Sequence, residues 1–281
     1  MISPVAAVAP AWIGAILLWW QMPSPSSVTP AGKAKHDVPQ ALATDQERPE
    51  RSDDVRQALL ASGLFGKTDP AALSRWCEQL MPVRIAPGRV NCARGNFGGR
   101  LYVIMSGKVE ISHYRLGGCE IALTVLGRYE IAGGVSLFDP AVCETRVTAL
   151  TEVLVVPIER GQVLMWMAEC SEFSAQMLRL YARRTKEMTD ALTDFAFADV
   201  SGRVASRLLL LRRRFGHLDG EVVRIVHDLT LQDLSRLVGA SPELIGHALR
   251  DFENRGWIRL DDKSVVVIDS QALASYRNPL S

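Results

Sequence analysis

Hydrophobic and polar positions change their spacing three times along this chain. Between Val55 and Leu80 apolar residues recur at helical spacing, which predicts two short amphipathic helices. From Val83 to Pro157 the period becomes two, and glycines separate short runs rich in β-branched residues, at 90–92, 101–104, 109–111, 121–125, 147–150 and 153–156. Short strands at this spacing predict one antiparallel β-sandwich or barrel-like roll.

The next segment has the spacing of a long helix without glycine or proline. Steps of four and three residues connect Met177, Tyr181, Arg184, Met188, Ala191 and Phe195. This is the seam of a coiled coil, so we expect the helix to form a dimer interface; the alternative is a helix packed on its own β domain. Arg184 on that seam would need an acidic partner or a polar cavity.

The C-terminal block predicts helix, strand pair, helix, turn, helix and hairpin. Thr230 and Asp233 form a capping-box pattern at the start of a short helix, and Gly239-Ala240 supplies a tight turn. Ser241 caps the next helix, with Pro242 at its first position. Two helices joined by a short turn, followed by a hairpin, predict a winged helix-turn-helix that enters a DNA major groove.

The second helix of this motif carries the candidate base-reading residues. Glu243 can accept a hydrogen bond from cytosine N4, and His247 can donate one to a purine N7. Ser241 and the helix N-terminus can hold a phosphate. Four cations flank this surface and are expected to contact the DNA backbone: Arg236, Arg250, Arg255 and Lys263. Leu244, Ile245, Ala248, Leu249 and Phe252 are assigned to the core. A winged helix used only for protein contacts is the alternative.

The amino-acid composition limits which classes of protein and which kinds of site remain possible. The formal net charge is +1, so any DNA contact must come from local patches. Five scattered cysteines predict neither a disulfide framework nor a metal site, and they suit a reducing cytoplasm. The sequence carries no hydrolase, metalloprotease, P-loop or dinucleotide-binding motif, so we expect no enzyme. Residues 1–54 form an apolar and then Pro/Ser-rich extension, for which disorder is favoured over a membrane anchor.

Four stretches of the chain resemble the cyclic-AMP receptor protein/FNR family of bacterial regulators. They are RLYVIMSGKVEIS, GGVSLFDP, DFAFADVSGRVASRLLLL and LTLQDLSRLVGASPELIGHALRDFENRGWI. The resemblance implies an α+β chain: an effector β-roll of the cyclic-nucleotide-binding type at 55–170, a dimerisation helix at 171–200 and a winged helix at 201–275. It also implies a homodimer through 177–195, roughly palindromic double-stranded DNA sites and contact with RNA polymerase.

The chain departs from this family in the effector pocket. Alignment on SLFDP keeps Gly133, but Gly134 stands at the glutamate position that holds the ribose, and Cys143 and Glu144 stand at the Arg and Ser/Thr positions that hold the cyclic phosphate. Arg184 is retained. Met188, beside Thr189, occupies the threonine position that meets adenine. Because a phosphate needs a cationic partner rather than a carboxylate, we predict no cofactor and no cAMP binding in the family manner.

Several interpretations of the altered pocket stay open. The domain can be a ligand-free scaffold, bind a less anionic molecule, or sense oxidants through Cys143; a regulator that still responds to cAMP through a rearranged pocket is the alternative. The DNA-reading helix departs as well. Pro242 and His247 replace the usual basic residues and Leu231 replaces a phosphate-contacting arginine, whereas Gln232 is kept. These changes predict a non-standard operator, or else an adaptor that no longer binds DNA.

Overall fold

The computed structural model describes residues 48–88, 90–92, 99–114, 120–138, 145–220, 222–226, 229–261 and 264–277. Residues 1–47 lie outside this set, so most of the predicted N-terminal extension is not described. Helix α2 (Arg48–Ala61) begins before the predicted start at Val55, and residues 48–54 therefore belong to a helix rather than to the extension. None of the helices in these ranges is both long and apolar enough to cross a membrane.

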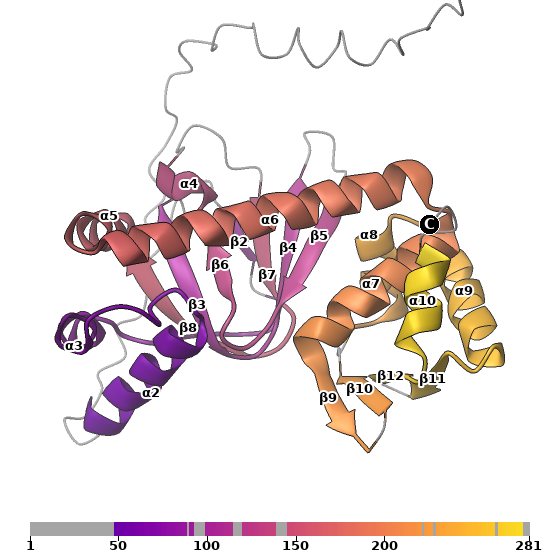
Figure 1. Cartoon of the computed structure of the whole chain (residues 1–281), viewed down its shortest axis with the longest axis horizontal. Coiled ribbons are helices and arrows are strands. Elements are labelled where there is room, and N and C mark those ends of the chain that lie inside the picture. Colours follow the sequence, from indigo (N-terminus) through magenta and orange to yellow (C-terminus); the bar gives the residue numbers. More distant parts are fainter. Residues whose placement is uncertain are drawn as a thin grey trace, which may run out of the picture. The chain divides into compact units, whose positions relative to one another are not determined.

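Two four-stranded antiparallel sheets form the β-roll, with strand orders β1-β8-β3-β6 and β2-β7-β4-β5 (Figure 1). Their strands are β1 (Val83–Ile85), β2 (Val90–Cys92), β3 (Arg100–Ser106), β4 (Val109–Tyr114), β5 (Glu120–Leu126), β6 (Ile131–Gly133), β7 (Thr145–Ala149) and β8 (Val153–Glu159). The six strands predicted from the sequence are confirmed. β1 and β6, three residues each, were not predicted from the sequence.

Four helices cover one end of the roll and share an aromatic core. They are α2, α3 (Pro70–Glu78), α5 (Arg160–Glu169) and α6 (Ser171–Phe197), while the single-turn helix α4 (Val135–Phe138) follows β6. Trp76 stacks on Trp166 with ring centroids 4.5 Å apart, and Phe65 and Phe173 pack edge-on or tilted against them. All four side chains are at most 2% exposed. Replacing one with alanine would cost about 3–5 kcal/mol, so this cluster fixes the start of α6 on the roll.

The long helix ends where the chain turns into the C-terminal domain. Ala198 has extended backbone, and the Asp199 carboxylate accepts a hydrogen bond from the Gly202 amide at 2.7 Å, which caps α7 (Val200–Phe215). The rest of the domain follows the predicted order: β9 (Gly216–Asp219), β10 (Val222–Val226), α8 (Leu231–Val238), α9 (Pro242–Asn254), β11 (Ile258–Asp261), β12 (Ser264–Val267), and then α10 (Ser270–Arg277). β9–β12 form one antiparallel sheet of order β11-β12-β10-β9.

Helix α10 was not predicted from the sequence. It packs along α7, and Tyr276 contributes a ring 5.6 Å from those of Phe252 and Trp257. The same buried cluster includes Ala122 and Val125 of β5, so the C-terminal domain and the β-roll share apolar contacts. Burial of these side chains on both elements holds α8 against β5.

Candidate nucleic-acid interface and effector pocket

The caps predicted for α8 and α9 are present in the structure. The Thr230 hydroxyl accepts from the Asp233 amide at 3.1 Å, while the Asp233 carboxylate accepts from the Thr230 amide at 2.8 Å. Gly239 ends α8 with φ +70°, a left-handed conformation that suits glycine. Ser241 then caps α9, with Pro242 at the first position. Gly239 at the end of α8 and Ser241 at the start of α9 therefore form the turn of the helix-turn-helix.

Helix α9 presents a polar face to solvent and an apolar face to the core. Ile245, Ala248, Leu249 and Phe252 are at most 6% exposed and are assembled into the core as predicted. On the opposite face the exposed residues include all four predicted DNA contacts, Ser241, Glu243, His247 and Arg250. The assignment of Leu244 to the core was wrong: its side chain is 52% exposed, because its position is one residue before the buried stripe begins.

The flanking residues differ in how much of their charge is available. Gln232, on α8, is exposed. Arg255 donates to the Asp251 carboxylate at 2.9 Å and its guanidinium lies over the rings of Trp257 and Tyr276, so it is exposed but already engaged. Lys263 lies outside the described residues.

Arg236 has a different role from the predicted backbone contact. Its guanidinium donates to the Asp233 carboxylate at 2.7 Å and to the Glu110 carboxylate at 3.1 Å. Glu110 belongs to β4, and its side chain is 2% exposed. This ion pair holds the guanidinium against the β-roll and engages its charge, although the Arg236 side chain is 37% exposed. Sequence reasoning missed Glu110 because the two residues are 126 positions apart.

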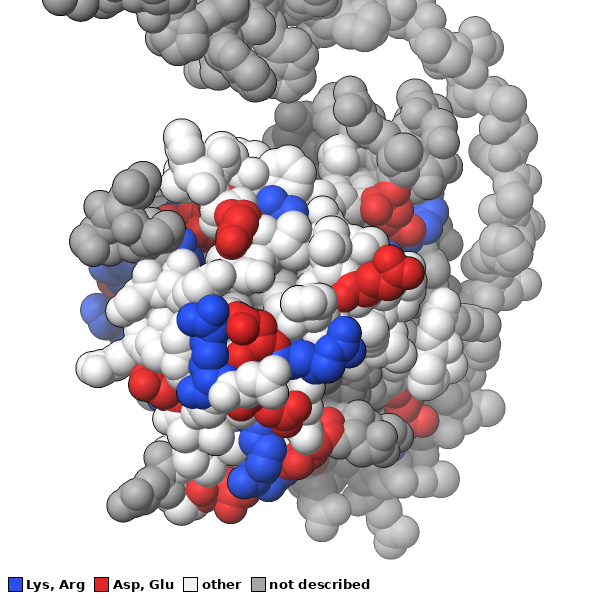
Figure 2. Space-filling view, turned by 90° about the vertical axis from the view of Figure 1, so that its right-hand side faces the viewer, with Lys and Arg blue, Asp and Glu red and all other residues white. Residues whose placement is uncertain are grey.

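The face of the molecule over the C-terminal domain carries interspersed charge. In Figure 2, basic and acidic side chains alternate among white, uncharged ones, and the described residues on this face form no continuous basic patch. This agrees with the formal net charge of +1. Affinity for a polyanion would therefore come from individual contacts, including helix N-termini, rather than from a broad positive field.

At the predicted effector pocket, an aromatic side chain occupies the space next to Gly134. Gly134 has φ +104°, and a Cβ placed there would lie 2.5 Å from the hydroxyl oxygen of Tyr181 and 3.2 Å from Leu101 Cδ1. Phe138 packs edge-on against the Tyr181 ring, with centroids 5.6 Å apart. A residue with a side chain is therefore unsuited to position 134 in this conformation. The spacing of residues gave no signal that Tyr181 would point here rather than along the helix surface.

Arg184 lines a polar cavity, which is one of the two environments that its sequence position required. Its guanidinium donates to the Gly133 carbonyl at 2.7 Å and to the Ile131 carbonyl, both on β6. Burial lowers the pKa of Arg184 below its ordinary value, the neighbouring Arg214 acts in the same direction, and Tyr181, Glu130 and Glu187 oppose them. The side chain thus attaches α6 to the β-roll of the same chain.

Two of the other predicted pocket residues are exposed to solvent, and the other two lie outside the described residues. Met188 is 56% exposed. Thr189 is exposed as well, and its hydroxyl donates to the Thr185 carbonyl at 3.0 Å within α6. Cys143 and Glu144 lie outside the described residues. The structure therefore brings Gly133, Gly134 and Arg184 together, and leaves Met188 and Thr189 on the open side of the helix.

One correction concerns the predicted dimer seam. Met177 is 1% exposed and packs in the core of its own β-roll, and Arg184 is bound to β6 as described above. The exposed stripe runs one position away from these two residues and has heptad spacing: Leu178, Thr185, Met188, Leu192 and Phe195. Tyr181 lies on the same face of the helix but is half-buried beside Gly134. Four of these side chains are more than half exposed, at 69%, 56%, 70% and 57% for Leu178, Met188, Leu192 and Phe195. Helical periodicity alone does not tell which of two adjacent faces the fold covers.

Comparison with known proteins agrees with this geometry. One family model, for a cyclic nucleotide-binding domain, matches residues 82–170, and another, for a Crp-like helix-turn-helix domain, matches residues 202–276. The chain is 42% identical over 218 residues to a protein of Mycobacterium tuberculosis strain H37Rv named a CRP-like cAMP-activated global transcriptional regulator; the match covers 78% of the chain and 97% of that protein. It is 29% identical to the cyclic AMP receptor protein of Thermus thermophilus, over 78% of the chain and 96% of that protein.

Solved structures support the fold. FixK2 from Bradyrhizobium japonicum aligns with a TM-score of 0.62 at 14% sequence identity, over 70% of this chain and 96% of that one. At that identity the likeness shows only the architecture of β-roll, long helix and helix-turn-helix. Together with the two matching family models and the relative at 42% identity, it means that the chain belongs to the CRP/FNR family of DNA-binding transcriptional regulators.

Proposed function

We propose that this regulator binds a roughly palindromic operator as a homodimer, and that cAMP does not control it in the way usual for its family. The observation that carries the proposal is the pair of surfaces on either side of the α6–α7 turn. One is the exposed apolar stripe of α6, and the other is the exposed polar face of α9. A two-fold related pair of recognition helices matches a two-fold related pair of half-sites.

The homodimer is supported by the heptad spacing of the stripe. Large apolar side chains at this exposure and spacing are characteristic of helices that pair by inserting knobs into holes. Analytical ultracentrifugation of Leu192→Glu tests the assignment, because a carboxylate buried in a helix seam opposes association. Leu218→Glu is the matched control, since Leu218 is 84% exposed on β9, away from the stripe. We expect the first variant alone to be monomeric; dimers of unchanged affinity for both variants would place the interface elsewhere.

The DNA contacts are assigned by chemistry and position. We assign base recognition to Glu243 and His247, and phosphate contacts to Gln232, Ser241, Arg250, Lys263 and, with less available charge, Arg255. Their exposure on one side of α8 and α9 supports the assignment for the described residues among them. Contact with RNA polymerase is proposed on family membership alone.

Independence from cAMP is supported by the side chain that occupies the pocket. The relative at 42% identity carries cAMP activation in its name. In this chain the ribose-binding glutamate is replaced by Gly134, and the hydroxyl of Tyr181 lies where a side chain at that position would begin. Cys143 and Glu144 at the phosphate positions remove a cation and add a carboxylate. Both changes disfavour a cyclic phosphodiester.

The experiment is selection of binding sites from random DNA with and without cAMP, accompanied by calorimetric titration of cAMP. We expect the same palindromic sites at the same affinity in both selections, and no cAMP binding at micromolar concentrations. Micromolar cAMP affinity would mean that the pocket is rearranged but active. Absence of any selected site would support the adaptor interpretation instead.

A further inference from the structure

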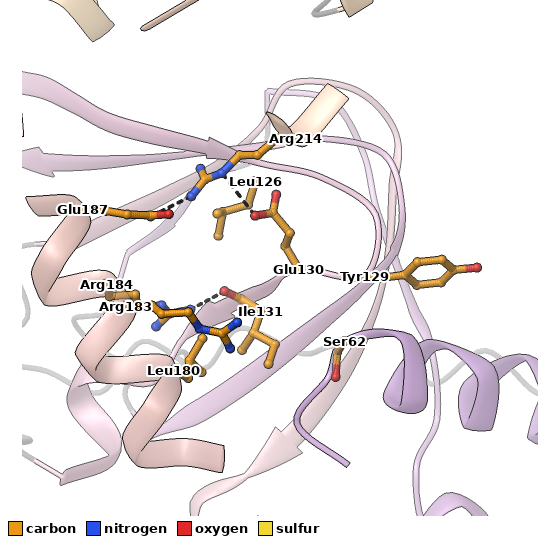
Figure 3. Close-up of a pocket in the computed structure, with 10 residues that line it drawn as sticks. All are labelled: Ser62, Leu126, Tyr129, Glu130, Ile131, Leu180, Arg183, Arg184, Glu187 and Arg214. Carbon is orange, nitrogen blue, oxygen red and sulfur yellow. Dashed lines mark hydrogen bonds and ion pairs between the residues drawn. The ribbon is translucent and has the colours of Figure 1, made fainter. Parts of the chain in front are cut away.

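The polar cavity that Arg184 lines lies beside α6, on the side of the β5–β6 turn. It has a volume of about 200 Å³. Figure 3 shows its walls: Tyr129 and Glu130 of the turn, Ser62 after α2, Arg183 and Arg184 of α6, and Arg214 of α7. Four segments that are far apart in the sequence therefore meet around it.

Two of the three arginines in the wall are occupied by partners on the protein. Arg184 donates to the carbonyls of β6. Arg214 is 2.9 Å from the Glu187 carboxylate and 3.3 Å from that of Glu130, and it also donates to the Val125 carbonyl at 2.7 Å. Both glutamates of the wall are thus paired with the same guanidinium, whose side chain is 11% exposed.

Arg183 differs from both. Its guanidinium points into the cavity in Figure 3, and within the described ranges no hydrogen bond or ion pair of its side chain is found. Three arginines and two glutamates leave one positive charge on the wall. Arg183 is exposed, and an unbalanced positive charge in a concave site raises the local concentration of anions, so this charge favours an anion.

The cavity is separate from both surfaces already assigned. Its α6 residues, Leu180, Arg183, Arg184 and Glu187, are displaced around the helix by roughly a third of a turn from the apolar stripe. A partner helix on that stripe would leave the mouth open. Of the residues assigned to the family pocket, Arg184 also lines this cavity, whereas Gly133, Gly134, Met188 and Thr189 do not.

We propose that this cavity binds a small anion, with Arg183 as the bidentate donor to its carboxylate or phosphate group. A planar guanidinium matches either group with two parallel hydrogen bonds. The size sets an upper limit, since sites for drug-sized ligands begin at about 300 Å³. The ligand is therefore smaller than a nucleotide. Arg214 belongs to the first helix of the DNA-binding domain, so the occupied cavity contacts both domains.

Isothermal titration of the full chain without DNA tests this assignment independently of operator binding. The probes are acetate, benzoate and inorganic phosphate, at constant ionic strength in sodium chloride. We expect at least one to bind with a millimolar or lower Kd, and the Arg183→Gln variant to bind it at least tenfold more weakly. Binding of benzoate and acetate alone would identify a carboxylate ligand, and binding of phosphate alone a phosphate ester.

Arg179→Gln provides the matched control. Arg179 lies one turn earlier on α6, is 58% exposed, and pairs with Glu172 at 3.3 Å outside the cavity. Its replacement removes the same charge from the same helix and should leave the affinity unchanged. The proposal is overturned if none of the three anions binds, if Arg183→Gln binds as tightly as the unaltered chain, or if both variants lose affinity equally. Circular dichroism of each variant verifies that α6 is intact.

Discussion

The Glu110 carboxylate on β4 lies 3.1 Å from the guanidinium of Arg236 on α8, so the first helix of the DNA-binding motif is ion-paired to the effector roll. The carboxylate side chain is 2% exposed and the guanidinium side chain 37% exposed. Lys108, just before β4, makes a second contact between the roll and the C-terminal domain, donating to the Val226 carbonyl on β10 at 2.6 Å. The buried partner of this pair is therefore the anion, and its stability in that position depends on the cation.

Removing the cation should cost more than removing the anion. Arg236→Gln leaves a buried carboxylate without its counter-ion, and we expect the free energy of unfolding to fall by about 1–3 kcal/mol. Glu110→Gln leaves a neutral amide and an arginine that still reaches Asp233, so a smaller loss is expected. Urea denaturation of both variants and the double variant gives the coupling energy.

Arg259→Gln is the control for this comparison. Its side chain is 55% exposed and its nearest carboxylate, that of Asp261, is 3.8 Å away. A change within about 0.5 kcal/mol is expected for such a surface pair. Equal losses for Arg236→Gln and Arg259→Gln would show that burial of Glu110 contributes nothing to the pair.

The same carboxylate predicts a dependence of stability on pH. Burial raises the pKa of Glu110 above its ordinary 4.5; Asp233 and Glu120 add to the rise, and Arg236 opposes it. The folded state therefore binds this proton more readily than the unfolded state does. The contribution of Glu110 to the free energy of unfolding falls as the pH rises from about 4.5 through the raised pKa.

Comparison with Glu110→Gln isolates this term. We subtract the free energy of unfolding of the variant from that of the unaltered chain. This difference should decrease as the pH rises through that window and then level off. Some decline remains in the variant, because burial also raises the pKa of Glu130. A difference that stays constant from pH 4 to pH 7 would contradict the shift.

Gly134→Ala tests whether Tyr181 fills the effector pocket. At φ +104° an alanine is strained, which costs about 1–3 kcal/mol, and its Cβ would also lie 2.5 Å from the tyrosine hydroxyl. Gly63→Ala reports the strain alone, since Gly63 has φ +75° and nothing within 4 Å of its Cβ position. We expect Gly134→Ala to lower the melting temperature more, and Tyr181→Phe to relieve part of that excess when the two are combined. Equal losses at both glycines would mean that the hydroxyl is elsewhere.

The pattern of the sequence predicted local structure well, for reasons that the caps of α8 and α9 illustrate. Thr230 and Asp233 satisfy each other's backbone amides within four residues, so their arrangement is determined by spacing alone. The position of Ser241 next to Pro242 has the same local character. The site residues on α9 follow from these caps and from helical periodicity.

What could not be predicted depends on contacts between distant residues. Arg236 was expected at the DNA surface, but Glu110, 126 positions away, draws it to the roll. Arg184 and Met177 were expected at a dimer seam, but β6 and the roll core cover that side of α6. Tyr181 illustrates the same limit, because its place beside Gly134 depends on a positive φ that no side-chain pattern records.

The exposed face of α9 predicts a separation between specificity and affinity. Glu243→Ala and His247→Ala should each relax the preference at one position of the half-site, losing about 1–3 kcal/mol of discrimination there. Arg250→Gln should instead weaken binding to all sequences alike and reduce the salt dependence of binding, because it removes a phosphate contact. None of these three side chains is buried, so the variants should fold as the unaltered chain does. Site selection and fluorescence anisotropy at several salt concentrations measure both quantities. Uniform weakening by all three variants, with the selected sequence unchanged, would show that α9 holds the backbone and that another element reads the bases.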